Sequence, residues 1–188
     1  MVIGSIKKPS FIKETLKGWA NLIFACVLSL LVSLFTSMLM SSNIWKGIIG
    51  LFTMAILLCI IGNYAYNCAK NQKAYERTFK GEHSNTKHIF LGITISLPLI
   101  LQWILLMVLK YSQASVGDKV FSIYRLINAY YLPWINVICP NHTLEELSIM
   151  SVITMFAFTI MPIITFILVY NIVYHSIDIE KIIKYNRE

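Results

Sequence analysis

Residues 20–41 read ANLIFACVLSLLVSLFTSMLMS and contain no charged side chain. As a helix, this stretch of about 22 residues is roughly 33 Å long, enough to cross a hydrocarbon core about 30 Å thick. A second apolar stretch, 46–68, follows after only a few residues, and Trp45 stands between them as an interfacial aromatic residue. The two stretches therefore predict an antiparallel pair of transmembrane helices.

Two further apolar stretches, 89–110 and 148–174, have the same length and character. Each carries a proline near its middle, Pro98 and Pro162, where the missing N–H and the ring favour a helix kink. We therefore expect an all-α integral membrane protein, a single membrane domain (1–188) with a bundle of about four transmembrane helices.

The composition supports this interpretation. Of 188 residues, 57% are hydrophobic and 13% are charged, whereas soluble domains have roughly 45–50% apolar and about 25% charged residues. The formal net charge of +7 comes mainly from side chains beside the apolar stretches. We therefore expect the lipid bilayer, with its anionic headgroups at the cytoplasmic face, to be the partner of these charges, and we expect no nucleic acid.

The distribution of basic residues predicts the orientation in a cell membrane. Twelve of the 16 lysines and arginines lie before the first stretch, in the polar loop 69–88 or in the C-terminal tail. The positive-inside rule then places both termini and this loop in the cytoplasm of a multi-pass protein. Polar residues in the first half of the loop favour a helix that continues beyond the membrane.

Residues 119–139, KVFSIYRLINAYYLPWINVIC, are long enough for a fifth span. Arg125 and Asn128 would then lie near the bilayer centre, where an arginine costs about 2.5–3.5 kcal/mol on insertion scales. Pro133 would also end the helix after Leu132. We therefore expect an amphipathic helix on the outer side between the third and fourth spans, either interfacial or re-entrant.

This outer segment contains the candidate ligand-binding residues. A cation among aromatic side chains needs a partner, and an anionic ligand is one candidate. The alternative is a membrane anchor, in which the arginine extends toward water and the aromatic rings lie among the headgroups. The candidate binding residues are Arg125, Asn128, Tyr130, Tyr131 and Trp134.

A stripe of small residues recurs every four positions along the first stretch. Small side chains let another helix approach closely in a membrane. The partner is either the second stretch or a different subunit, and the sequence leaves both open. The stripe consists of Ala25, Ser29, Ser33, Ser37 and Ser41.

No complete catalytic motif is present, and all nine carboxylates lie outside the four apolar stretches. His83 and His88 are too few for a metal site, which needs three or four ligands, so we expect no metal and no cofactor. The leading hypothesis is a non-enzymatic accessory or assembly subunit of a larger membrane complex, such as a transporter. The alternative is a solute-binding or transport protein with an outward-facing pocket, and a third is a membrane enzyme acting on lipid or peptide.

Overall fold

The computed structural model describes residues 9–36, 42–79, 86–112, 116–139, 143–145 and 147–185, with side chains described as far as His175. Every regular element in these residues is helical. The elements are α1 (Phe11–Phe35), α2 (Asn43–Phe79), α3 (Lys87–Ser112), α4 (Gly117–Ile127), the 3-10 turn η2 (Ala129–Tyr131), α5 (Leu132–Ile138) and α6 (Ile149–Tyr185).

Four of these helices are long and apolar enough to cross a membrane, and they correspond to the four predicted stretches: α1, α2, α3 and Ile149–His175 of α6. Large apolar side chains project from their outer surfaces, among them Phe24, Leu51 and Leu168, which are more than half exposed. A bilayer accepts such surfaces directly. The prediction of an all-helical fold with four helices long and apolar enough to span a membrane is thereby confirmed for the described residues.

The helices extend beyond the predicted spans. Helix α1 begins at Phe11, directly after Pro9 and Ser10, so Lys13 and Lys17 lie in its first turns. Helix α2 has 37 residues and continues to Phe79, as predicted from the polar residues that follow the second apolar stretch. Residues 37–41, expected to complete the first span, lie outside the described residues.

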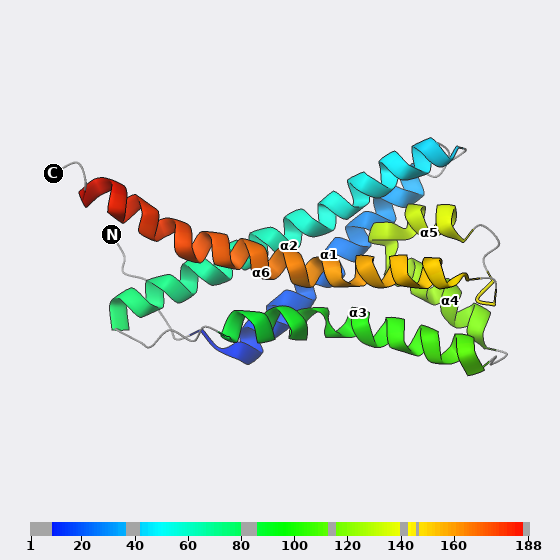
Figure 1. Ribbon diagram of the computed structural model, residues 1–188, viewed down its shortest axis with the longest axis horizontal. Helices are drawn as coiled ribbons and strands as arrows, with labels where there is room; N and C mark the ends of the chain where they lie inside the picture. The colour runs from blue at the N-terminus through cyan, green and yellow to red at the C-terminus, as the bar shows by residue number, and fades with distance from the viewer. Residues whose placement is uncertain are drawn as a thin grey trace.

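Helices α2 and α6 cross near the middle of the molecule (Figure 1). The end at which α1 begins and α2 and α6 end is here called the terminal end, and the end at which α1 ends and α2 begins is called the hairpin end (Figure 1). Toward the hairpin end the α1–α2 pair diverges from α3 and α6 (Figure 1). Helix α4, η2 and α5 lie in this opening and contact α1, α2 and α3. Residues 117–138 are called the wedge segment below.

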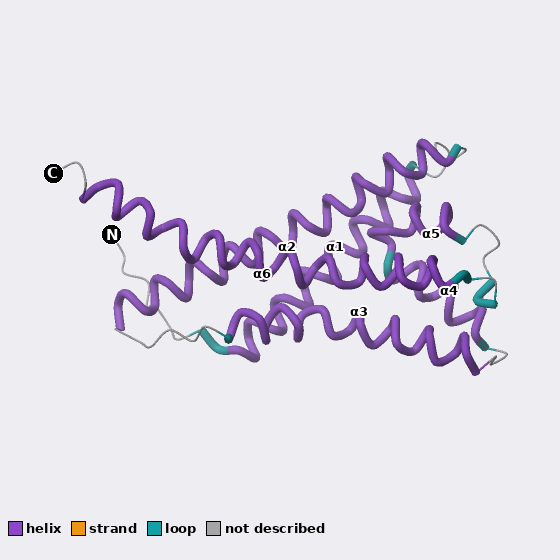
Figure 2. The backbone as a smooth tube through the Cα atoms, viewed as in Figure 1, coloured by secondary structure: helices purple, strands orange, loops and turns teal. Residues whose placement is uncertain are grey.

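The wedge segment differs in detail from the single amphipathic helix expected within residues 119–139. It consists of two short helices joined by the 3-10 turn, and Figure 2 shows the helices folded back against each other. Pro133 lies in the first turn of α5, where its missing N–H leaves no helical hydrogen bond unmade. The proline therefore starts a helix here instead of ending one.

Candidate functional site

A lateral groove of about 520 Å³ lies between α1 and α3, bounded toward the hairpin end by the last residues of α4. Nearly all of its lining is apolar, and the amide of Gln102 is its main polar group. The lining residues are Trp19, Leu22, Ile23, Cys26, Val27, Leu30, Pro98, Leu99, Gln102, Leu126 and Ile127.

Helix α1 provides one continuous face to the groove. Its lining residues recur at helical spacing from Trp19 to Leu30, a length of roughly 16 Å at 1.5 Å per residue. Leu22 is only 4% exposed and forms part of the floor, whereas Ile23 and Val27 on the rim are 63% and 51% exposed. The groove is therefore open sideways, in the direction from which membrane lipid would reach the bundle.

At its terminal end the groove is closed because α1 and α3 approach each other closely. A Cβ atom on Gly18 would lie 2.5 Å from Cγ1 of Ile95, so only glycine permits this contact. One residue further, Trp19 Nε1 donates a hydrogen bond of 3.0 Å to the Thr94 carbonyl. This carbonyl lacks its usual helical donor because residue 98 is a proline without an N–H.

Pro98 and Trp19 should therefore be energetically coupled. Trp19→Phe leaves the Thr94 carbonyl without a donor, and we expect the free energy of unfolding to fall by about 1 kcal/mol. In the Pro98→Ala background the backbone N–H of the introduced alanine is available to Thr94, so the same change should cost less. SDS titration of the four proteins of this cycle measures the coupling. Equal costs of Trp19→Phe in both backgrounds would contradict it.

At the hairpin end the groove is closed by Leu126 and Ile127 of the wedge segment. Asn128 Nδ2 holds this end against α3 by donating to Gln102 Oε1 at 3.1 Å. Thr53 Oγ1 holds it against α2 by donating to the Tyr130 carbonyl at 2.9 Å. Gln102 lies roughly 15 Å along α3 from Ser112, so the wedge segment reaches well into the bundle.

The structure does not gather the five predicted ligand-binding residues around this groove. Asn128, Tyr130 and Tyr131 are 0% exposed and belong to the core of the wedge segment. The Arg125 guanidinium donates to the side chain of Asn136 and lies 5.9 Å from the Phe121 ring centroid.

Trp134, the fifth of these residues, packs on the surface of α2. A Cβ atom on Gly50 would lie 2.5 Å from the indole ring, so the indole lies directly on the glycine backbone. The partner that Arg125 required is thus an amide of the same segment. The aromatic residues of the wedge segment lie between the α1–α2 pair and α6, where Tyr131 and Trp134 pack against Phe158.

The described members of the small-residue stripe lie inside the bundle. Ala25 and Ser29 are 0% exposed and Ser33 is 4% exposed. Ser29 Oγ donates to the Thr53 carbonyl of α2 at 3.2 Å. Ser29 thus joins α1 to α2, and all three residues are covered by the rest of the bundle. Ser37 and Ser41 lie outside the described residues.

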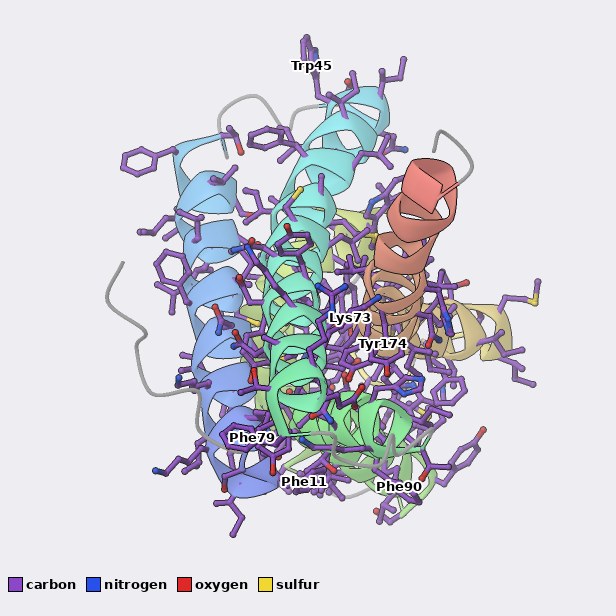
Figure 3. The ribbon with its side chains drawn as sticks, turned by 90° about the vertical axis from the view of Figure 1, so that its left-hand side faces the viewer. Phe11, Trp45, Lys73, Phe79, Phe90 and Tyr174 are labelled. Atoms are coloured by element: carbon purple, nitrogen blue, oxygen red, sulfur yellow. The ribbon has the colours of Figure 1, made fainter. Side chains whose placement is uncertain are left out.

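A polar cluster joins the helices near the terminal end. Lys87 Nζ of α3 lies 3.1 Å from Glu14 Oε2 of α1 and donates to Gln72 Oε1 of α2 at 3.2 Å. Lys73 Nζ of α2 donates to the Tyr174 carbonyl of α6 at 2.6 Å, and Figure 3 shows these two side chains next to each other. The sequence analysis used Lys73 and Lys87 only to predict the orientation of the chain. In the structure both lysines also connect helices.

The structure places His88, one of the two histidines considered as metal ligands, against an aromatic ring. His88 stacks on Tyr170 with ring centroids 4.9 Å apart, and His83 lies outside the described residues. Among the described residues, no three histidine, cysteine, aspartate or glutamate side chains are grouped as metal ligands would be.

Comparison with known proteins yielded no relative. No family model matches the chain, and no curated protein or solved structure matches it. The site therefore has to be interpreted from its own geometry.

Sequence reasoning missed the groove because its residues resemble any lipid-facing helix surface. Two features of the sequence were consistent with a groove. Apolar residues recur at helical spacing after Trp19, and Pro98 predicts an unpaired backbone carbonyl in another apolar stretch. Neither feature shows that the two helices separate beyond their contact at Gly18 and Ile95.

Proposed function

We propose that this multi-pass membrane protein binds an apolar molecule carried in the bilayer and does so without catalysing a reaction. The observation that carries the proposal is the groove of about 520 Å³ in the wall of the bundle. Its size lies within the range of about 300–1,000 Å³ typical of small-molecule sites. Its lining of leucine, isoleucine and valine, with the single amide of Gln102, favours an apolar ligand. This is a form of the solute-binding hypothesis, with a lateral site in place of an outward-facing pocket.

The proposal includes an orientation in the membrane. The basic residues gather at the terminal end, which we assign to the cytoplasm together with both termini, where Lys13 and Lys17 would meet anionic headgroups. The groove then lies in the cytoplasmic half of the bilayer.

We further propose that the wedge segment is re-entrant from the outer side. The exposed face of α4 carries Ile123, Leu126 and Ile127, which are 55%, 54% and 41% exposed. Apolar side chains on the free face of a short helix favour contact with lipid over contact with water.

Photolabelling tests the proposal. In proteoliposomes, an alkyl chain that carries a diazirine should label residues of α1 between Trp19 and Leu30. Val27→Trp places a large ring on the rim of the groove, and we expect it to reduce this labelling several-fold. Phe24→Trp is the matched control, because Phe24 is 60% exposed on the same helix and does not line the groove.

The control should label as the unchanged protein does. If Val27→Trp and Phe24→Trp label equally, the probe reports only general contact with lipid, and the proposed binding site is wrong. Thermal unfolding of each variant in detergent establishes that the comparison is made between folded proteins.

An accessory subunit of a larger membrane complex is the second candidate. Helices α2 and α6 have 37 residues each, roughly 55 Å, which exceeds the membrane core by about 25 Å. Their ends project beyond α3 at the terminal end (Figure 1), where they would be available to another subunit. A partner in constant stoichiometry after gentle purification would support this role, and purification of the chain alone would contradict it.

A further inference from the structure

We infer that the occupant of the groove is a single lipid acyl chain and that the α4 end of the groove selects the length of that chain. This inference rests on the proposed function and adds the chemical class of the ligand. It follows from the length of the groove, from the nature of its two ends and from the rigidity of the end formed by α4.

The length of the groove matches one leaflet of a bilayer. From Trp19 to Leu30 the groove extends roughly 16 Å along α1. The hydrocarbon core is about 30 Å thick, so the chains of one leaflet extend about 15 Å. A chain of the leaflet on the lysine-rich side, lying along α1, would thus extend from the interface near Trp19 to the end of the groove.

A whole helix of another protein does not fit this space. An α-helix with its side chains is about 10–12 Å wide, whereas α1 and α3 touch at Gly18 and Ile95 and enclose only about 520 Å³ beyond that contact. A strongly polar ligand would find few partners, because Gln102 Oε1 already accepts a hydrogen bond from Asn128. A flexible apolar chain meets neither obstacle.

The α4 end of the groove is fixed in place. Leu126 and Ile127 form it, and Asn128 directly after them is fully buried and bonded to α3. The next turn is bonded to α2 through Thr53 and the Tyr130 carbonyl. A chain longer than the groove would therefore contact Leu126 and Ile127, called the wall below, whose position is fixed by hydrogen bonds to both α3 and α2.

The preference for one chain length must come from van der Waals packing in the groove and not from the hydrophobic effect. A lipid chain leaves one apolar environment for another, so its transfer gains little from the removal of water, and van der Waals packing provides the preference. A short chain leaves a void at the α4 end, and a long chain must bend out over the rim. Binding should therefore have an optimum in chain length.

A competition experiment tests this inference. Lysophosphatidylglycerols whose single saturated chains differ in steps of two carbons compete with the diazirine probe for the full-length protein in phosphatidylcholine vesicles. For the unchanged protein we expect several-fold stronger competition at one chain length than at the shortest and longest chains. Ile127→Ala removes three carbon atoms from the wall and lengthens the groove. It should therefore shift the optimum to a longer chain.

Two control variants accompany this measurement. Ile123→Ala is the matched control, because Ile123 is exposed on the same helix and does not line the groove. Its optimum should remain that of the unchanged protein. Leu126→Ala provides a second change at the wall if Ile127→Ala fails to fold, and it should shift the optimum in the same direction.

The outcomes separate this inference from the proposed function. If all chain lengths compete equally while Val27→Trp still reduces labelling, the groove binds apolar molecules without selecting their length, and the inference is wrong. If the optimum is the same in the wall variants and the unchanged protein, α4 does not set the length. If the groove is not labelled at all, the proposed function itself is wrong.

Discussion

Replacing Tyr131 by alanine should lower the free energy of unfolding by roughly 3–5 kcal/mol, the range measured for buried aromatic side chains. Tyr131 is 0% exposed. Its ring centroid lies 4.7 Å from that of Tyr130 and 5.3 Å from that of Phe158 of α6, and its hydroxyl shares a hydrogen bond with that of Tyr124. Truncation would leave a cavity where the wedge segment meets α6.

Tyr66→Ala is the matched control, because Tyr66 is 44% exposed on α2. A surface change of this kind usually alters stability by about 0.5 kcal/mol or less. SDS titration in mixed micelles measures both variants against the unchanged protein. Equal effects of the two substitutions would mean that the wedge segment does not pack in the core of the bundle.

Alanine at Gly50 and at Gly47 should have effects of opposite sign. A Cβ atom on Gly50 would lie 2.5 Å from Cδ1 and Nε1 of Trp134, and a ring atom cannot turn away as the end of a flexible chain can. Accommodating it requires α5 to move, at a cost of about 1–3 kcal/mol. A Cβ atom on Gly47 would lie 3.8 Å from the nearest atom of the same indole, an ordinary contact.

Gly47→Ala should therefore raise stability by up to about 1 kcal/mol, through the higher helix propensity of alanine. The thermal unfolding midpoint and the tryptophan emission maximum of each variant measure the two effects together. A Gly50→Ala protein as stable as Gly47→Ala, with unchanged emission, would show that α5 does not lie against α2 as described.

The four long apolar helices could be predicted from sequence because each is a continuous apolar stretch. Residues 20–41 and 46–68 are too long and too uncharged to be covered in a soluble domain of this size. The helical continuation of α2 to Phe79 was likewise predictable from its residues alone. The constraint is local in both cases, so the distant parts of the chain do not alter it.

The wedge segment could be predicted only in outline. The sequence predicted an amphipathic helix here, with Arg125 and Asn128 among the candidate ligand-binding residues. In the structure Asn128 turns inward to Gln102, from which it is separated by 26 residues, and Thr53 bonds to Tyr130 across 77 residues. Such partners satisfy polar groups inside the bundle, and no local pattern of residues specifies them.

The groove could not be predicted because it arises from the relative position of two helices. α1 and α3 touch at Gly18 and Ile95 and are separated further along by Leu126 and Ile127 of α4. A lipid-facing residue and a groove-lining residue have the same chemistry on one helix. Only the second helix distinguishes them.

Native mass spectrometry of the protein released from vesicles of phosphatidylglycerol and phosphatidylcholine tests the lipid-binding groove most directly. We expect the unchanged protein and Phe24→Trp to retain one lipid after detergent removes the surrounding lipids, and Val27→Trp to retain none. Loss of all lipid from the unchanged protein, or the same retained lipid in Val27→Trp, would contradict a lipid-binding groove between α1 and α3.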